Sequence, residues 1–133
     1  MVHAPCPEHL RAPTASSLHG IATLMHILAD AVPPRTAIRQ IEALFVIAYA
    51  HRMGRSVTLR DVVEAVDEDG GARALERSIH VFTAPSRVYP DALDWVEQVP
   101  DPDDRRKRYL RLTAKGVSAL AAMFAAMSQE ADR

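Results

Sequence analysis

"WVEQVPDPDDRRKRYLRLTAKG", residues 95–116, predicts a β-hairpin that continues into a helix. The first five residues form one strand, the turn-forming PDPDD follows, and RRKRYLRL forms the returning strand. Side chains alternate along a strand, so Leu110 and Leu112 point to one side while Tyr109 and Arg111 point to the other. Thr113 then caps the next helix. We expect the two leucines to fix this hairpin to the core of the protein.

Positive charge is concentrated in the same hairpin, although the chain of 133 residues has a formal net charge of only −1. Five cations fall within seven residues: Arg105, Arg106, Lys107, Arg108 and Arg111. Three acids, Asp101, Asp103 and Asp104, stand directly before them. The run can be a solvated surface on which the acids are local counter-charges. Alternatively, one acid holds an arginine in a fixed rotamer, which prepares its guanidinium group for binding DNA.

Helices are expected on both sides of the hairpin. Apolar residues recur at helical spacing over 17–32, 37–53, 59–66 and 72–84, and again over 113–131. Thr36 is expected to cap the second of these helices, and Thr58, with Asp61 three residues later, the third. Three helices followed by a hairpin form the winged helix-turn-helix layout. We therefore predict a mainly α (α+β) fold with a two-stranded β-hairpin as the wing and dimerisation helices at both ends.

The helix over 72–84 is the candidate recognition helix, because it directly precedes the hairpin. Its apolar face contains Leu75, Ile79 and Phe82. At 100° per residue, the opposite face contains Arg73, Arg77 and His80. Any amphipathic helix has an exposed polar face, but the second helix of a helix-turn-helix enters the major groove. We therefore predict that Arg73, Arg77 and His80 contact DNA.

Length and composition indicate a single domain covering residues 1–133. With 48% hydrophobic and 25% charged residues the chain can bury a core, and its longest nearly apolar run, 41–50, is too short to span a membrane. We expect a flexible tail at 1–16, a DNA-binding core at 36–112, and dimerisation helices at 17–32 and 113–131. The first of these helices is apolar over most of its circumference, which favours a partner subunit. The prolines near the N-terminus interrupt any apolar leader, so we expect a cytoplasmic protein.

Residues with catalytic or metal-binding chemistry are few. The sequence has no glycine-rich phosphate loop, no supported metal cluster and no nucleophile with an evident base, so we predict neither an enzyme nor a cofactor. His3, Cys6 and His9 are evenly spaced and could be drawn as metal ligands. Prolines bracket the cysteine, however, and a structural zinc site needs four ligands on a supported scaffold. We therefore interpret this segment as a tail.

Residues 101–116, DPDDRRKRYLRLTAKG, resemble the wing of the MarR family of bacterial transcriptional regulators. In that family an Asp-x-Arg element is followed by a strand, a Leu-Thr pair and a glycine in the next helix. The corresponding positions here are Asp104-Arg105-Arg106, Leu112-Thr113 and Gly116. The resemblance implies a homodimeric repressor that binds a pseudo-palindromic operator in double-stranded DNA, with a recognition helix in each major groove and a wing arginine in each minor groove.

The same resemblance implies roles for individual wing residues. Asp104 would orient Arg106, and Arg106 would enter the minor groove. The neighbouring cations, including Arg105 and Arg108, are expected to hold the hairpin to the phosphate backbone. Many relatives are released from DNA by small aromatic acids or by cysteine oxidation, so a small aromatic ligand is a candidate effector.

The sequence departs from the family pattern in two places. Residues 83–94, TAPSRVYPDALD, are longer than the usual connection between recognition helix and wing, and they allow a second register with a recognition element near 86–89. Pro90 argues against that register, since it would break such a helix. The chain also ends soon after residue 127, so the final dimerisation helix is expected to be missing or merged with the preceding one. These features and the acids at 67–69 and 101–104 keep a second hypothesis open: a winged-helix interaction module that binds protein without reading DNA sequence.

Overall fold

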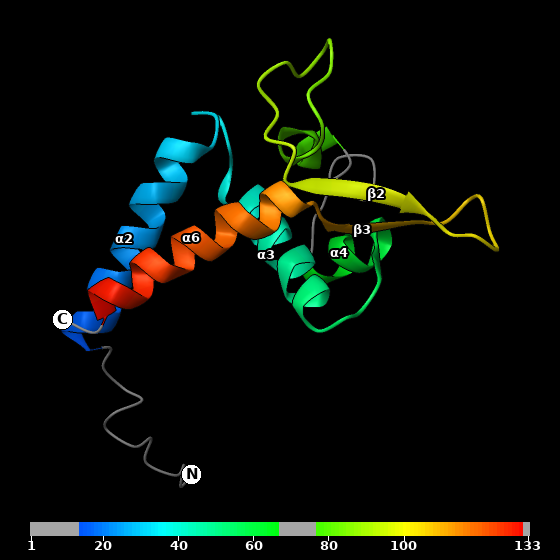
Figure 1. Ribbon diagram of the computed structural model, residues 1–133. Coiled ribbons are helices and arrows are strands. Elements are labelled where there is room, and N and C mark those ends of the chain that lie inside the picture. The colour runs from blue at the N-terminus through cyan, green and yellow to red at the C-terminus, as the bar shows by residue number, and fades with distance from the viewer. Residues whose placement is uncertain (1–13, 67–76, 132–133) are drawn as a thin grey trace, which may run out of the picture. The chain divides into compact units, whose positions relative to one another are not determined.

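The computed structural model describes residues 14–66 and 77–131 of the chain. The chain forms two compact units: Val32–Leu120 is one, and Met1–Ala31 together with Ala121–Arg133 is the other. Figure 1 labels the helices and strands. The last helix, α6 (Ala114–Ala131), begins in the first of these units and ends in the second.

The larger unit, Val32–Leu120, contains two α-helices that precede strands 96–100 and 108–112 in the chain. They are α3 (Ile38–Arg52) and α4 (Leu59–Val66). The expected capping box of α4 is confirmed: the Thr58 hydroxyl accepts from the Asp61 N–H at 3.2 Å, and the Asp61 carboxylate accepts from the Thr58 N–H at 2.9 Å.

The cap predicted for α3 is wrong by one residue. Ala37, with extended φ and ψ, occupies the N-cap position, and its N–H donates to the Gln40 side chain at 2.5 Å. The hydroxyl of Thr36 is buried without a hydrogen-bond partner among the described residues. The Gln40 side chain thus satisfies the N–H of the N-cap residue, while Ala37 contributes no capping side chain of its own.

The sheet has three strands, where the sequence predicted only two. Strand β2 (Val96–Pro100) and strand β3 (Arg108–Leu112) form the expected antiparallel hairpin, and β1 (Val57–Thr58) pairs with the other edge of β3. Val57 lies opposite Leu110, and Thr58 lies opposite Tyr109. The short extended piece before α4 thereby gains partners for its backbone groups, which would otherwise be left unpaired.

The core of this unit lies between α3, α4 and the inner face of the sheet. The largest side chains with less than 2% exposure in it are Leu44, Ile47, Val62, Val66, Ile79, Phe82 and Val96. Phe82 stacks on Trp95 with ring centroids 6.3 Å apart. Leu110 and Leu112 are both buried, as the strand alternation predicted. The hairpin is thus fixed at its base while its turn extends away from α3 and α4 (Figure 1).

The start of α6 is joined closely to the base of the hairpin. The Thr113 N–H donates to the Trp95 carbonyl at 2.9 Å, and the Thr113 hydroxyl accepts from the Gly116 N–H at 3.0 Å, which confirms the predicted cap. A Cβ placed on Gly116 would lie 2.9 Å from the carbonyl carbon of Trp95 and closer still to its oxygen. Only glycine allows the helix to approach the strand this closely.

The smaller unit contains α2 (Ala15–Ala31) and the second half of α6. The helix begins two residues earlier than predicted, because the Thr14 hydroxyl accepts from the Ser17 N–H at 3.0 Å and supplies the cap. Residues 15 and 16 therefore belong to the helix, where a tail was expected.

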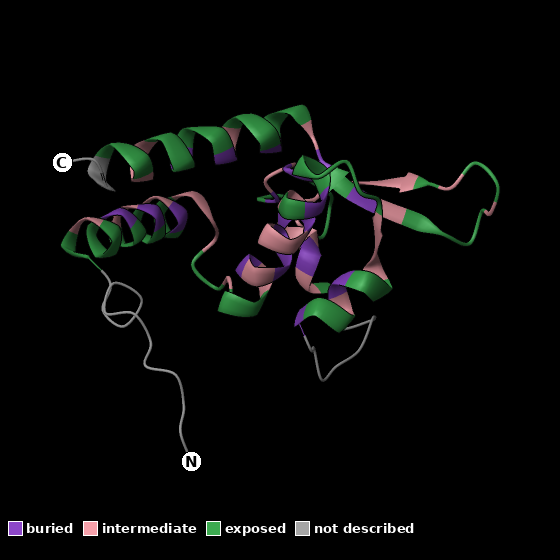
Figure 2. Cartoon of the chain, turned by 90° about the horizontal axis from the view of Figure 1, so that it is seen from below, coloured by how far each residue is buried: buried purple, intermediate pink, exposed green. Residues whose placement is uncertain are grey.

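Helix α2 has a buried stripe and an exposed apolar stripe. Gly20, Leu24 and Leu28 are buried. Three other apolar residues remain open to solvent: Leu18 at 53%, Ile21 at 52% and Met25 at 45% exposure. Figure 2 shows the mixture of buried and exposed residues along this helix. An apolar stripe of this kind is typical of a surface that another protein chain covers.

Candidate nucleic-acid interface

The turn of the hairpin spans residues 101–107 and is longer than the predicted PDPDD. Its two ends are joined by the Asp101 N–H, which donates to the Lys107 carbonyl at 2.9 Å. The Lys107 N–H donates in turn to the Asp104 carbonyl at 3.0 Å. Residues 105–107, predicted as strand, therefore belong to the turn, and Figure 2 shows that this turn is mostly exposed.

Asp101 organises the turn through both of its carboxylate oxygens. One oxygen accepts from the backbone N–H groups of Asp103 and Asp104, at 2.8 and 3.3 Å. The other accepts from the Tyr109 hydroxyl at 2.7 Å. The Tyr109 hydrogen bond is the main cause that lowers the pKa of the Asp101 carboxyl, and the same bond raises the pKa of Tyr109. Sequence reasoning missed this pair, which is separated by the whole turn.

Asp104 contacts Arg106, the residue that it was predicted to orient. Its carboxylate accepts from the backbone N–H of Arg106 at 3.0 Å. An aspartate that bonds the N–H two residues later fixes the local course of the chain. The acids of the turn thus define its backbone, and the adjacent guanidinium groups are left to face solvent.

The cations at the tip form no hydrogen bond or ion pair through their side chains within the described part of the chain, although Lys107 helps to lower the pKa of Asp101. Arg105, Arg106, Lys107 and Arg108 are exposed, and none of their side chains makes a hydrogen bond or ion pair with another described residue. Arg111 differs from these four, since its Nε donates to Glu97 on the facing strand at 2.6 Å. The positive charge of the tip is therefore available to an external anion.

The predicted recognition residues are only partly described. Arg73 lies outside the described residues, while Arg77 is exposed in a helical segment over 77–79 that runs into the 3-10 helix η1 (His80–Phe82). The imidazole of His80 stacks on the ring of Tyr89, with centroids 5.0 Å apart and an interplanar angle of 14°. Ile79 and Phe82 are fully buried, as their predicted face requires. Arg77 thus faces solvent, whereas the imidazole ring of His80 packs against Tyr89 and is only partly exposed.

Residues 83–94 form a closed loop without a helix. Three backbone hydrogen bonds join its ends: Leu93 to Val81 at 2.9 Å, Asp94 to Thr83 at 2.9 Å and Trp95 to Phe82 at 2.7 Å. Between these ends the chain makes only turns, centred on Ser86 and Tyr89. The alternative register, with a recognition helix near 86–89, is therefore excluded.

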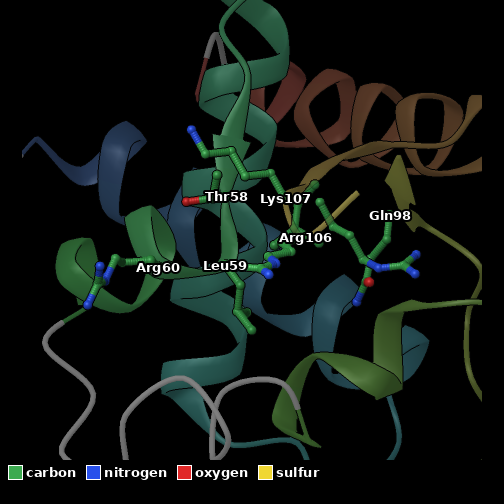
Figure 3. Close-up of a pocket in the computed structure, with 8 residues that line it drawn as sticks. Thr58, Leu59, Arg60, Gln98, Arg106 and Lys107 are labelled. Atoms are coloured by element: carbon green, nitrogen blue, oxygen red, sulfur yellow. The ribbon is translucent and has the colours of Figure 1, made fainter. Parts of the chain in front are cut away.

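A hollow of about 380 Å³ lies between the start of α4 and the hairpin (Figure 3). The α4 side contributes Thr58, Leu59 and Arg60, and the hairpin side contributes Gln98, Arg106, Lys107, Arg108 and Leu110. Arg60 was not among the predicted site residues. Arg60 lies on the face of α4 opposite the buried Val62 and Val66. This helical spacing could have indicated from the sequence that Arg60 is an exposed cation.

Other kinds of site find no support in the described residues. No helix among them is long and apolar enough to cross a membrane. They contain no group of three or more His, Cys, Asp or Glu side chains arranged to hold a metal ion. His3, Cys6 and His9 lie outside the described residues.

Comparison with known proteins identifies the fold. No protein-family model and no curated protein sequence matches the chain. The structure is similar to a cysteine-to-serine variant of MarR from E. coli in complex with operator DNA, with a TM-score of 0.56 and 20% identity over 88% of this chain and 71% of that one. A single-site variant of MepR from S. aureus gives a TM-score of 0.52 and 17% identity over 91% of this chain and 80% of that one. The apo form of E. coli MarR gives 0.50 and 20%, over 88% and 74%.

These similarities define the chain as a winged helix-turn-helix protein. The winged-helix architecture predicted from the sequence is therefore confirmed. Within that class, the fold is the one found in MarR and MepR, in agreement with the resemblance noted in the wing sequence.

Proposed function

We propose that this protein is a sequence-specific, DNA-binding regulator of transcription that acts as a homodimeric repressor. The observation that carries the proposal is the hairpin tip, where four exposed cations form no ion pair within the described residues and the turn extends away from the helices of the core (Figure 1). A solved structure with the same fold is bound to operator DNA. Such a tip suits a polyanion, because binding releases the counterions condensed on its phosphates.

Arg106 is the residue proposed to enter the minor groove. Asp101 and Asp104 fix the backbone that leads up to it, since Asp101 accepts from the Asp104 N–H and Asp104 accepts from the N–H of Arg106 itself. Arginine is favoured in narrow minor grooves because the negative potential is enhanced there. Arg77, exposed next to the buried Ile79, is the described candidate for the major groove.

The exposed stripe of α2 supports the dimer. Leu18, Ile21 and Met25 recur at helical spacing and remain about half exposed in the single chain. Covering this stripe with a second copy would remove apolar area from water. A dimer would also match the two-fold symmetry of a pseudo-palindromic operator.

Fluorescence anisotropy with a labelled duplex tests the proposal directly. The duplex carries the promoter of the gene that encodes this protein, and a shuffled duplex of equal length serves as competitor. We expect tight binding that prefers the promoter and weakens steeply as salt is raised. Binding that is weak and indifferent to sequence would instead favour the interaction module.

A pair of variants isolates the wing in the same assay. Arg106→Ala removes a cation without a described partner, whereas Arg111→Ala removes one that is already paired with Glu97. We expect Arg106→Ala to lower promoter affinity at least tenfold and Arg111→Ala to change it little. Equal affinities for both variants and the wild type would contradict the wing assignment. Small aromatic acids added to the wild-type complex test for an effector, whose binding would be seen as release of DNA.

A further inference from the structure

The hollow between α4 and the hairpin joins two segments that are far apart in the sequence. Residues 58–60 form one wall, and strands β2 and β3 with the end of the turn form the other. Figure 3 shows Arg60 from α4 and Arg106 and Lys107 from the hairpin around the same space. The pairing of β1 with β3 brings these walls together, since Thr58 lies opposite Tyr109.

The lining of this hollow is cationic and contains no acid. Arg60, Arg106, Lys107 and Arg108 contribute four positive charges. The acids nearest to these cations in the sequence accept from backbone groups: Asp61 from the Thr58 N–H at 2.9 Å, and Asp104 from the Arg106 N–H at 3.0 Å. None of the four cations makes a side-chain hydrogen bond or ion pair within the described chain. Four cations thus line one hollow, and although Lys107 also interacts with Asp101, an anion bound in the hollow would be attracted by all four.

The walls between the charges also suit an extended polar ligand. The half-buried Gln98 has an amide group that makes no side-chain hydrogen bond to another described residue. Leu59 and Leu110 supply apolar surface. The hollow therefore presents cations, an amide donor and apolar side chains to a ligand.

We propose that this hollow holds a phosphate of the DNA backbone, with Arg60 as the contact supplied by α4; the inference rests on the proposed function. A DNA strand is favoured over a small free anion because the cations are exposed and hydrated. Exposed cations bind a small anion weakly, whereas a DNA strand carries many phosphates and releases condensed counterions into the solvent as each protein cation neutralises a phosphate.

The proposed contact would set the position of the wing on the duplex. A phosphate contact carries no sequence information but fixes the register and orientation of the protein. A DNA strand held between α4 and the hairpin would fix the position of the wing tip, and of the segment that contains Arg77, relative to the base pairs of the operator.

The test measures the salt dependence of binding for four proteins: the wild type, Arg60→Ala, Arg60→Lys and Arg111→Ala. Anisotropy titrations against the promoter duplex and the shuffled duplex give the slope of log affinity against log salt. We expect Arg60→Ala to weaken binding to both duplexes by a similar factor, about tenfold, and to reduce the slope by about 0.9. Arg60→Lys should keep the slope, because a lysine also neutralises a phosphate. Arg111→Ala should resemble the wild type.

The outcomes separate the inference from the proposed function. If the wild type binds neither duplex, the proposed function fails and the phosphate site fails with it. If the wild type binds but Arg60→Ala keeps the wild-type slope, the phosphate site alone is wrong. A slope reduced equally by Arg111→Ala would also overturn the inference, since it would show a general effect of charge. Arg60 is exposed at the start of α4, and a circular dichroism melt confirms that each variant is folded.

Discussion

Replacing Gly116 with alanine sets two physical effects against each other. Alanine is favoured over glycine inside a helix by about 1 kcal/mol, so propensity alone predicts a more stable protein. In the structure, the added Cβ would lie 2.9 Å from the Trp95 carbonyl carbon, whereas ordinary contact begins at 3.4 Å. The strand and the helix must separate by at least the difference, 0.5 Å.

The cost of that separation is expected to exceed the gain. The obstructing atoms are backbone, and the Trp95 carbonyl is held by the Thr113 N–H at 2.9 Å. Overpacking against a rigid neighbour costs about 3 kcal/mol, so the net loss in the free energy of unfolding is about 2 kcal/mol. For a chain of this length the midpoint of thermal unfolding should fall by roughly 8 °C.

Urea and thermal unfolding, followed by circular dichroism, measure this change. Ala122→Gly in the exposed part of the same helix is the matched control, and it should destabilise by about 1 kcal/mol through propensity alone. Both variants should then be less stable than the wild type, although one replaces glycine with alanine and the other replaces alanine with glycine. An unfolding midpoint for Gly116→Ala at or above that of the wild type would refute the close approach at Trp95.

Three further predictions concern the turn, the dimer and the recognition segment. Tyr109→Phe should lower the free energy of unfolding at neutral pH, because it removes the hydrogen bond to the Asp101 carboxylate. The pKa of Asp101 in the folded protein lies below its ordinary value of 3.8. The stabilisation by this hydrogen bond is therefore present above pH 3.8 and is lost as the pH falls through the folded pKa. The difference between wild type and Tyr109→Phe in urea titrations should therefore shrink below pH 3.8, and a constant difference would contradict the hydrogen bond as its source. Ile21→Asp should convert a dimer to a monomer in light scattering after gel filtration, because it places a charge on the exposed apolar stripe; an unchanged mass would remove α2 from the interface. Arg77→Ala should reduce the preference for the promoter over the shuffled duplex in competition titrations by a factor of ten or more, whereas an equal loss on both duplexes would indicate a phosphate contact.

Local signals in the sequence predicted much of this fold. The capping box of Thr58 and Asp61, the cap at Thr113 and the burial of Leu110 and Leu112 all depend on residues within one turn or one strand. Patterns of this range can be detected without knowing the tertiary structure. The winged-helix layout followed from the order of such elements.

The misses have a different physical origin. The pairing of Val57 with Leu110 is non-local, and two residues are too few to show a strand pattern. At α3 the N-cap is Ala37, one residue after the predicted Thr36, and the Gln40 side chain accepts from the Ala37 N–H.

The candidate site was predicted unevenly for the same reason. The cations of the tip stand together in the sequence, so their concentration was visible. The position of Arg60 beside them depends on the three-stranded sheet, which only the structure reveals. The stacking of His80 on Tyr89 likewise depends on how residues 83–94 fold back.

The closed loop at 83–94 has a consequence for how this protein can vary. Its ends are tied by backbone hydrogen bonds, which hold whatever the side chains are, and the tip residue Val88 is 76% exposed. Lengthening such a loop costs little, because closure entropy grows only with the logarithm of its length. Residues can therefore be inserted at the tip without changing the distance between Phe82 and Trp95. This makes the loop a natural point for attaching a reporter peptide and for divergence in length between related chains.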